Sequence, residues 1–528
     1  MNATSIRTKD FFDAFRRCDY PDATIEDYFA QNRTGPIFIV DFLPSPRVDS
    51  YQTPNRNSQF ARMDSPHVAH RSRSPHVPPR RRPQTHRKYR APRLQMELLE
   101  SRDVPSTVHW ISTGSTDWTV PGNWSTGLAP SYNDDVYFDN AGTVSTTNAG
   151  TGLILGTLNS LHVLSNYTQT ITMATSLWVG TLEMRAGEGG KIEQPTLGLD
   201  LTVTTRLDWT SGTINSTQNL ANLIISGATA LIAPANAGAV NTGSLLKLVN
   251  GAQLTELPGE VDFANGAGMD IGDSCTATMA PTVQATVRHT DVSHAGGMIT
   301  VRQGGLYIVT GESDYLIPAV YDAKLPLLNY GTVIVRNAST MMVTVTQPAE
   351  GGPQPAYYQY ADPSGAVTSI ENGSTLTAVS VASGQSSRGL VWIDGGVIQT
   401  VRPNDTLTTA KVDGDMKVTR DTTVSVGVGA NIRTPFNVLR VFGTVDWQGG
   451  TYTPRVDNSG SSSLWQSDRA FTVGTGVSIS PIQLSTPLVN QTFTIIQGAS
   501  VTGTPPTVTA WTVLMNSPTT EWDIKYTP

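Results

Sequence analysis

The sequence predicts an all-β protein whose body is a β-solenoid, and three observations lead to this fold class. From residue 107 onward, short runs of alternating apolar and polar residues are separated by Gly, Asn, Asp, Ser and Pro, as in half-buried strands joined by tight turns. No segment of comparable length has helical periodicity. Short segments containing Trp and Gly recur along the body, and units that bury a face only against their neighbours form solenoids.

The strand pattern is clearest in "TTVSVGVGANI", residues 422–432. Val424, Val426 and Val428 alternate with small or polar residues. Successive side chains of a strand point to opposite faces, so these three valines would lie on one face. We therefore expect a half-buried strand here.

Three segments share the pattern of a strand, a glycine bend and a second strand. They are "LDWTSGTI" at 207–214, "VDWQGGTY" at 445–452 and, more distantly, "VWIDGGVI" at 391–398, which keeps Trp392 and Gly395. Glycine suits such a bend because it tolerates a positive φ and a close backbone path. The copies are few and degenerate, so two or three β-sandwich domains are the alternative architecture.

Composition divides the chain near residue 102. Residues 1–102 contain 18 of the 36 Lys and Arg residues and 11 of the 43 Asp and Glu residues, a balance of +7, whereas the remainder has a balance of −14. Gly35 is the only one of 47 glycines before residue 103, and all ten tryptophans lie from Trp110 onward. We therefore expect two parts of different physical character.

The first part divides into three segments, and the rest forms one body. Residues 1–43 have helical spacing in short pieces without a core of their own, which predicts a weakly helical segment. Residues 44–97 are basic, rich in Pro, Arg and Ser and poor in apolar residues, which predicts disorder. Residues 98–106 form a junction, and residues 107–528 form the β-solenoid body.

The basic run at residues 71–90, "RSRSPHVPPRRRPQTHRKYR", suits contact with nucleic-acid phosphates. Nucleic-acid binding is nevertheless disfavoured, because the run is not attached to a folded nucleic-acid-binding motif and the body that follows it is acidic. The run is also not followed by the apolar segment that export signals contain. No stretch reaches the roughly 18 apolar residues of a membrane-spanning helix, so no such helix is expected.

The start of the body resembles a known group of proteins. In residues 109–144, "HWISTGSTDWTVPGNWSTGLAPSYNDDVYFDNAGTV" follows the layout "W…NWS.G..P...D.V.F". This layout is similar to the opening of bacterial secreted right-handed β-helix proteins, including autotransporter-like and adhesin-like passengers. Residues 490–506 and the final "EWDIKYTP" resemble the closing strands of such units. The resemblance implies a right-handed parallel β-helix.

The junction carries a second resemblance. "LLESRDVPS", residues 98–106, looks like the "LExR.VPS" element of many large planctomycete surface and exported proteins, where it follows a basic N-terminus and precedes a β-rich body. In those chains the element lies within a few dozen residues of the start. We therefore expect that the gene model extends too far upstream, that residues 1–62 are not translated and that translation starts near Met63. The matching residues are Leu99, Glu100, Arg102, Val104, Pro105 and Ser106.

Catalytic and metal-ligating patterns are sparse in the body. The densest titratable cluster, "RHTDVSHAGG", contains His289, Asp291 and His294, but the spacing of the two histidines puts them on opposite faces of a strand. Asp134 and Asp135 form the closest acidic pair, and we expect them to cap turns of the first coil. With only two cysteines and no clustered ligands, the sequence predicts no catalytic residue, no metal site and no cofactor.

Trp118 and Trp124 are the candidates for carbohydrate binding, because a flat ring face suits the apolar face of a sugar. They lie near one end of the body in a context rich in Gly and Ser. The other interpretation, which we favour, is that the two rings close the end of the solenoid and shield its core.

Together these features predict a non-enzymatic extracellular or cell-surface protein with a structural or adhesion role, whose partners are surface polysaccharide or other surface proteins. The main alternative is a β-helix protein that degrades or binds polysaccharide, and a nucleic-acid-associated protein is the third. The localisation rests on the resemblance, because the sequence contains no ordinary signal peptide. The sequence predicts no particular ligand, attachment mechanism or oligomeric state.

Overall fold

The structure is a computed structural model that describes residues 105–513 with gaps. The chain divides into two units, Met1–Arg102 and Asp103–Pro528, and all described residues belong to the second unit. The gaps are residues 140–141, 149–156, 197, 217–220, 235–238, 283–284, 292–296, 312–318, 348–353, 361–364, 372, 383–384, 402–408, 429–437, 458–461, 484–492, 505 and 509–511.

Several expectations concern residues outside this part of the chain. They are those for residues 1–97, for the start near Met63 and for the final "EWDIKYTP". The junction and cluster residues that also lie outside the described residues are Leu99, Glu100, Arg102, Val104 and His294.

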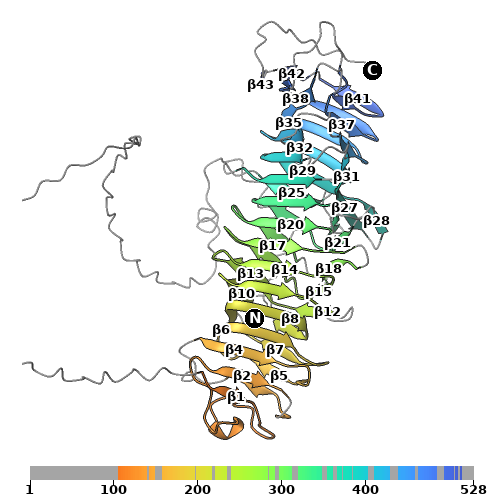
Figure 1. Ribbon diagram of the computed structural model, residues 1–528. Coiled ribbons are helices and arrows are strands. Elements are labelled where there is room, and N and C mark those ends of the chain that lie inside the picture. Colours follow the sequence, from red (N-terminus) through yellow and green to blue (C-terminus); the bar gives the residue numbers. More distant parts are fainter. Residues whose placement is uncertain are drawn as a thin grey trace, which may run out of the picture. The chain divides into compact units, whose positions relative to one another are not determined.

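The described residues form a parallel β-solenoid of about 12 turns (Figure 1). Each turn of the chain, here called a coil, contributes strands that pair with those of the coils before and after it. Among the described residues every strand pairing is parallel except that between β27 (Thr375–Ala382) and β28 (Gln385–Arg388). The predicted all-β solenoid is confirmed, and the β-sandwich alternative is wrong because sandwich sheets are antiparallel. No helix in this part of the chain is long and apolar enough to cross a bilayer.

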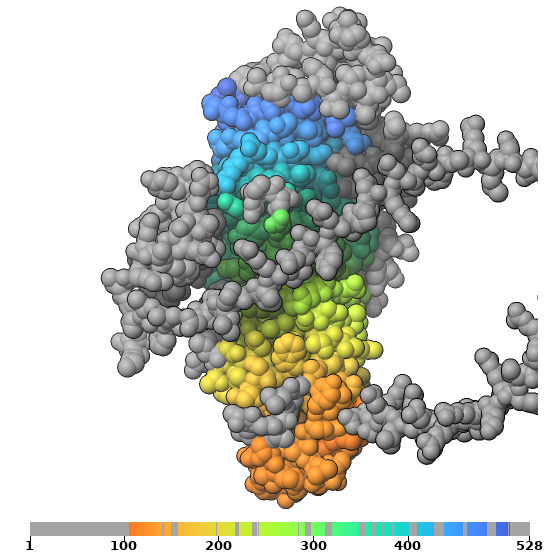
Figure 2. Space-filling model, turned by 90° about the vertical axis from the view of Figure 1, so that its left-hand side faces the viewer, coloured from red at the N-terminus to blue at the C-terminus, as the bar shows by residue number. Residues whose placement is uncertain are grey.

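The strands of successive coils stack into three ladders, and the coils follow one another in chain order along the body (Figure 2). Ladders 1 and 2 belong to one 25-stranded sheet, because four long strands bend from one ladder into the other. Ladder 3 is a 15-stranded sheet that includes β28.

The following strands make up the ladders. Ladder 1 contains β10 (Asn222–Ser226), β13 (Leu245–Val249), β16 (Met269–Ile271), β19 (Ile299–Val301), β22 (Leu327–Asn329), β25 (Pro355–Tyr360), β29 (Leu390–Asp394), β32 (Asp415–Thr419) and β41 (Ser500–Gly503). Ladder 2 contains β1 (Thr107–His109), β2 (Asp135–Phe138), β4 (Leu158–Val163), β11 (Thr229–Ile232), β14 (Gln253–Glu256), β17 (Thr276–Met279), β20 (Leu306–Thr310), β23 (Thr332–Arg336), β26 (Val367–Glu371), β30 (Val397–Val401), β33 (Thr423–Val428) and β42 (Thr507–Val508). The long strands are β6 (Leu177–Arg185), β8 (Asp200–Ser211), β35 (Val445–Thr453) and β38 (Ala470–Ile479). Besides β27 and β28, ladder 3 contains β3 (Thr146–Thr147), β5 (Thr170–Thr172), β7 (Lys191–Gln194), β9 (Thr213–Ser216), β12 (Ala239–Thr242), β15 (Gly259–Phe263), β18 (Val287–Asp291), β21 (Val320–Ala323), β24 (Thr340–Thr346), β31 (Thr409–Asp413), β34 (Val438–Val441), β37 (Leu464–Ser467) and β40 (Ile496–Gln497). A separate three-stranded sheet contains β36 (Arg455–Val456), β39 (Ile482–Gln483) and β43 (Thr512–Val513).

Inward side chains in register fill the core. In ladder 1, Leu223, Leu246 and Met269 occupy one position in successive coils and are at most 1% exposed. The coils differ in length, because 23 residues separate Leu223 from Leu246 whereas 34 separate Tyr357 from Val391. Insertions therefore fall between the strands, and the sequence has no fixed repeat period for this reason.

The recurring Trp and Gly segments mark corners of the coil. In β8, Trp209 lies in ladder 2, and Gly212 (φ +89°) leads the chain into ladder 3. In β35, Trp447 lies in ladder 1, and Gly450 (φ +90°) leads the chain into ladder 2. Both rings are buried. A Cβ on Gly450 would lie 2.0 Å from the carbonyl oxygen of Thr422, so both the φ and the close backbone approach require glycine.

The third segment fits this pattern only after a shift of one residue. Ile393, rather than Trp392, shares an inward column with Val418 and Trp447. Trp392 points to the outside and is partly exposed. The predicted equivalence of Trp392 with the other two tryptophans is wrong, because neighbouring residues of a strand point to opposite faces.

The first coil covers its own free edge. After the 3₁₀ helix η1 (Pro121–Asn123), the chain runs back along β1, where the amide of Ser125 donates to the carbonyl of His109 at 2.9 Å. The amide of Ile111 donates to the carbonyl of Asn123, also at 2.9 Å. An uncovered strand edge would be a template for pairing with another chain, and this segment blocks it.

Candidate functional site

Of the predicted titratable cluster, the structure describes the side chain of His289 alone, and it points into the core. The Nε2 atom of His289 lies 2.5 Å from Oε2 of Glu256, and its Nδ1 atom lies 2.9 Å from Oη of Tyr321. Tyr307 donates a hydrogen bond to Tyr321. Asp291 ends β18. We call Glu256, His289, Tyr307 and Tyr321 the core network. It joins three neighbouring coils through β14, β18, β20 and β21.

The core network is enclosed by protein. All four residues are completely buried. Burial raises the pKa values of Tyr307 and Tyr321 well above their usual range, with the charge of Glu256 adding to the rise, so both phenols stay protonated. Because Tyr307 donates to Tyr321, Tyr321 donates to Nδ1 of His289, and the imidazole hydrogen lies on Nε2 facing Glu256. The network therefore links coils and offers no atom to an external substrate.

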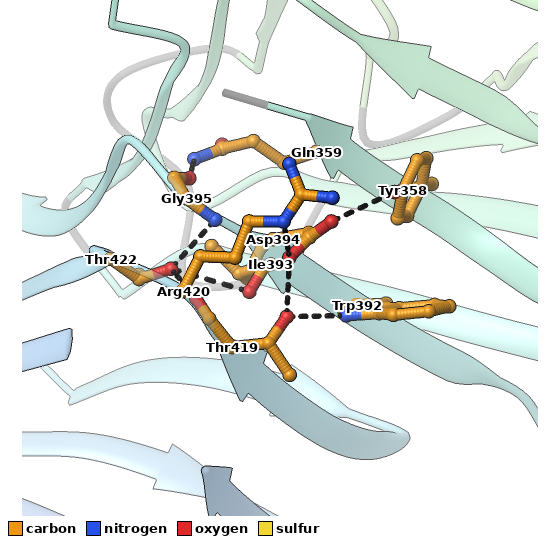
Figure 3. Close-up of polar contacts among 9 residues, drawn as sticks. All are labelled: Tyr358, Gln359, Trp392, Ile393, Asp394, Gly395, Thr419, Arg420 and Thr422. Atoms are coloured by element: carbon orange, nitrogen blue, oxygen red, sulfur yellow. Dashed lines mark hydrogen bonds and ion pairs between the residues drawn. The ribbon is translucent and has the colours of Figure 1, made fainter. Parts of the chain in front are cut away.

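A second polar cluster lies at a corner of the coils that contain β25, β29 and β32 (Figure 3). Asp394, only 4% exposed, is its centre. Its Oδ2 accepts a hydrogen bond from Tyr358 at 3.1 Å, and its Oδ1 accepts one from Thr419 at 2.6 Å. Nε of Arg420 forms an ion pair with Oδ1 at 3.1 Å, and the indole of Trp392 donates to Thr419 at 2.8 Å. We call these five residues the Asp394 cluster.

The inner side of the same corner is held by backbone contacts. The amide of Gly395 donates to Oγ1 of Thr422 at 2.8 Å, and that hydroxyl donates to the carbonyl of Thr419 at 2.6 Å. Nε2 of the buried Gln359 donates to the carbonyl of Gly395 at 2.8 Å (Figure 3). The cluster is thus fixed to its corner from both sides.

Aromatic side chains extend the Asp394 cluster along the outer face. Tyr358 and Trp392 pack with their ring centroids 5.1 Å apart at 66°, and Nζ of Lys417 lies 4.6 Å from the centre of the Trp392 ring. Cζ of Arg420 lies 5.1 Å from the centre of the Tyr360 ring. Burial, followed by the nearby Asp394 carboxylate, raises the pKa of Tyr358. Rings in successive coils thus contact one another and the two cations, while each ring remains partly exposed.

A third group of side chains, near the first coils, is arranged like the serine, histidine and carboxylate of a nucleophilic triad. Nε2 of His162 lies 2.8 Å from Oγ of Ser160, and its Nδ1 lies 2.6 Å from Oε2 of Glu183. However, Oγ of Ser160 also lies 2.5 Å from Oδ1 of Asp135 and donates its hydrogen there, and Ser160 is only 5% exposed. A nucleophilic serine gives its hydrogen to the imidazole and must reach a substrate, so this arrangement is better suited to joining β2, β4 and β6.

Trp118 and Trp124 lie inside the first coil, at the N-terminal end of the solenoid. Each is 1% exposed, and their ring centroids are 5.5 Å apart. Trp110 and Phe138 pack against Trp124 at 5.0 and 6.0 Å. Neither candidate presents a ring face to a sugar, because their neighbours enclose them. Their burial agrees with the other interpretation, in which they close the end of the core.

Ser106, the last residue of the junction element, is tied to the first coil. Its amide and hydroxyl donate to Oδ1 of Asp134, while Ser131 donates to Oδ2 in the same two ways. Burial opposes ionisation, but these four hydrogen bonds outweigh it and hold the pKa of Asp134 below its usual value. Asp134 thus caps a turn of the first coil, as the sequence predicts.

The described residues contain no group of three or more His, Cys, Asp or Glu side chains arranged to hold a metal ion, and Cys275 is a buried free thiol. Comparison with protein families, characterised proteins and solved structures finds no match to this chain.

Proposed function

We propose that this chain is a non-enzymatic extracellular or cell-surface solenoid with a structural or adhesion role. The main support is that the polar side chains that could do chemistry are bonded to other residues of the solenoid. Asp394 is the clearest case, because both of its oxygens bind donors from the same coil or its neighbours. Both nitrogens of the His162 and His289 imidazoles also lie within hydrogen-bonding distance of other solenoid residues. One contact of His162 is within β4, to Ser160, and its other contact and both contacts of His289 reach other strands. A side chain committed to holding coils together is poorly placed to transform a substrate.

Further features support the proposal. The resemblance of residues 98–106 and 109–144 to exported surface proteins implies an extracellular or cell-surface location. The acidic balance of −14 after residue 102 disfavours non-specific binding of this part of the chain to nucleic acid. A long stack of coils also suits a spacer or contact surface, because each coil contacts only its neighbours and the stack can be long.

Protease treatment of intact cells of the native host tests the location. We expect an antibody against the full chain to lose its signal when a protease that cannot enter the cells is added, while a cytoplasmic marker stays intact. Protection of the chain until the cells are lysed, together with its recovery in the cytoplasmic fraction, would overturn the proposal.

Carbohydrate binding is the second candidate function, and the partly exposed aromatic residues Tyr358, Tyr360 and Trp392 favour it. A sugar would have to contact ring edges or displace Lys417 from the face of Trp392. Affinity electrophoresis of the full chain in neutral and acidic polysaccharides tests this. Retardation that is lost in Trp392→Ala but kept in Trp178→Ala, an exposed tryptophan far along the chain, supports binding. Release of reducing ends in the same mixtures would instead indicate a polysaccharide-degrading enzyme.

A further inference from the structure

The outer face of ladder 1 carries a column of large side chains. Leu328, Tyr358, Trp392 and Lys417 occupy the same outward position in four successive coils, each beside the next. All four side chains are partly exposed. The coil before Leu328 has Thr300 at this position. The solenoid therefore presents apolar and aromatic surface over a limited stretch of this face, and such patches mark binding sites.

Tyrosine rings form a second column beside the first. Tyr360 follows Tyr358 by two residues in β25, so both point outward, and their ring centroids are 6.3 Å apart. Tyr330, in the preceding coil, packs against Tyr360 with the ring centroids 5.7 Å apart at 67°. Tyr330 and Tyr360 are also partly exposed. We call the two columns the outer strip, and its members are Leu328, Tyr330, Tyr358, Tyr360, Trp392 and Lys417.

Two rings of the outer strip are held in place by the solenoid itself. Tyr358 donates a hydrogen bond to the buried Asp394 (Figure 3). The indole of Trp392 donates to Thr419, which donates to the same carboxylate. Side chains that are already ordered lose little conformational entropy when a ligand binds. The strip is therefore suited to recognition as well as to joining coils.

Two cations, Lys417 and Arg420, lie beside the rings. Nζ of Lys417 lies 4.6 Å from the centre of the Trp392 ring, and the side chain of Arg420 is 55% exposed. Asp446 is the neighbour of Lys417 in the following coil, but it accepts a hydrogen bond from Gln448. Among the ion pairs of the described residues none includes Lys417. Its ammonium is thus available to an anion from outside.

The distribution of charge along the chain favours an anionic ligand at this place. Residues 105–373 contain 21 Asp and Glu residues but only 8 Lys and Arg residues, whereas residues 374–528 contain 10 of each kind. Lys417 and Arg420 belong to the second of these parts. An anion at the cationic end of the outer strip therefore meets a part of the chain without net charge, rather than the acidic coils before it.

We propose that the outer strip binds a polysaccharide of uronic acids, an inference that rests on carbohydrate binding, the second candidate function, and gives it a ligand class. The apolar faces of the sugars would pack on the rings of Tyr358 and Tyr360, and their carboxylates would pair with Lys417 and Arg420. A uronic acid carries its carboxylate directly on the sugar ring, so a cation beside an aromatic ring can reach it. A carboxylate that draws Lys417 outward also uncovers the face of Trp392 for a sugar.

The size of the outer strip favours an extended polymer over a folded protein. Neighbouring strands lie about 4.8 Å apart and alternate residues of a strand about 7 Å apart, so the strip measures roughly 7 by 14 Å. A stable protein interface takes about 800 Å² from each partner, far more than the strip offers. A polymer of repeating sugars fits a narrow strip and can engage several copies of the protein at once.

Affinity electrophoresis in polygalacturonate tests the proposal. The starting protein is the full chain in which Gln replaces the eight Lys and Arg residues of the basic run at residues 71–90, because that run would attract any polyanion. We expect retardation at about 50 mM salt that is much weaker at about 500 mM salt. The neutral polymer pullulan should retard the protein far less. Lys417→Ala and Trp392→Ala should each weaken binding by about fivefold or more, whereas Lys417→Arg should keep most of it.

The matched controls are Lys247→Ala and Trp178→Ala. Lys247 lies in the same outward column of ladder 1, but its neighbours there are Ile224 and Asp270 rather than aromatic rings. Trp178 lies in that column too, in an earlier coil, and is 53% exposed. Both control variants should bind like the starting protein. Circular dichroism checks that every variant remains folded.

Several results would overturn the proposal. They are the absence of retardation by polygalacturonate, an equal loss in Lys247→Ala and Lys417→Ala, and stronger retardation by single-stranded DNA or by the sulfated galactan carrageenan. Equal retardation by pullulan that Trp392→Ala abolishes would leave carbohydrate binding standing and overturn the preference for uronic acids. Protease treatment of intact cells tests the location separately, so failure of either proposal can be told from failure of the other.

Discussion

The core network and the Asp394 cluster both link neighbouring coils, the first inside the core and the second at an outer corner. Each is built on a carboxylate that links neighbouring coils. Glu256 is completely buried and one of its oxygens, Oε1, has no hydrogen-bond partner. Both oxygens of Asp394 have partners, and one partner is Arg420, whose side chain is 55% exposed. The carboxylate of Glu256 is thus stabilised mainly by the imidazole of His289. The carboxylate of Asp394 is paired with the guanidinium of Arg420, which is also exposed to water.

This difference predicts that breaking the core network is the more damaging change. His289→Ala removes the donor to Glu256 and the acceptor of Tyr321, and leaves a buried carboxylate unpaired. Removing one member of a buried pair costs about 3–5 kcal/mol, and we expect a loss of free energy of unfolding in that range. The midpoint of urea unfolding measures it.

The matched control for this prediction is Thr290→Ala, the next residue of β18, whose hydroxyl donates to Glu260 on the outer face. We expect it to lower stability by only about 0.5–1.5 kcal/mol, as for a typical hydrogen bond. Equal losses in His289→Ala and Thr290→Ala would contradict the distinction between the two environments.

Asp394→Asn should have an intermediate effect. The amide keeps the volume of the side chain but loses the charge that pairs with Arg420. Its NH2 group is a donor only, so one of the two hydroxyls, that of Tyr358 or that of Thr419, loses its acceptor. We expect a loss of about 1–3 kcal/mol in urea unfolding. The control is Asp413→Asn, whose carboxylate is 47% exposed and 4.0 Å from Arg388, and which should change stability by less than about 0.5 kcal/mol. An Asp394→Asn variant as stable as this control would show that the cluster does not hold its corner.

A smaller effect is expected at Asp262, on the outer face beside the core network. Burial, and then the nearby Glu260, raise the pKa of Asp262 to about 6. The folded chain therefore holds this proton more tightly than the unfolded chain, so stability should fall as the pH rises from about 4 to about 6 and level off above that. In the Asp262→Asn variant, the midpoint of urea unfolding should change less between pH 4 and 6 than in the unaltered chain.

The control for the pH series is Asp421→Asn, an exposed carboxylate in the turn after β32. This variant should keep the pH dependence of the unaltered chain. A slope between pH 4 and 6 that persists unchanged in Asp262→Asn would show that another group is responsible.

The fold was predictable because strand alternation is a local signal. Val424 and Val426 alternate as expected and are buried in β33. Trp392 shows the limit of this reasoning. Its segment resembles those of Trp209 and Trp447, but its tryptophan lies one residue before the inward position. The register shift is visible only once Ile393 is placed beside Val418.

The clusters could not be predicted, because their members are far apart in the sequence and the coils differ in length. Glu256 and His289 are separated by 33 residues, and Asp394 and Thr419 by 25. Without a fixed period, no spacing indicates that these side chains meet. The sequence places His289 near Asp291 and His294, whereas its side chain contacts Glu256 and Tyr321 of the adjacent coils.

The polar side chains of the core network join neighbouring coils, and a comparison of single and double variants measures how strongly Glu256 and His289 depend on each other. Replacing a whole buried pair by apolar residues of similar volume is often neutral, whereas removing one partner is not. Glu256→Leu/His289→Leu should therefore unfold at a higher urea concentration than His289→Leu alone. If the double variant loses as much free energy of unfolding as the two single variants together, the two side chains act independently. That result would contradict their role in joining coils as a pair.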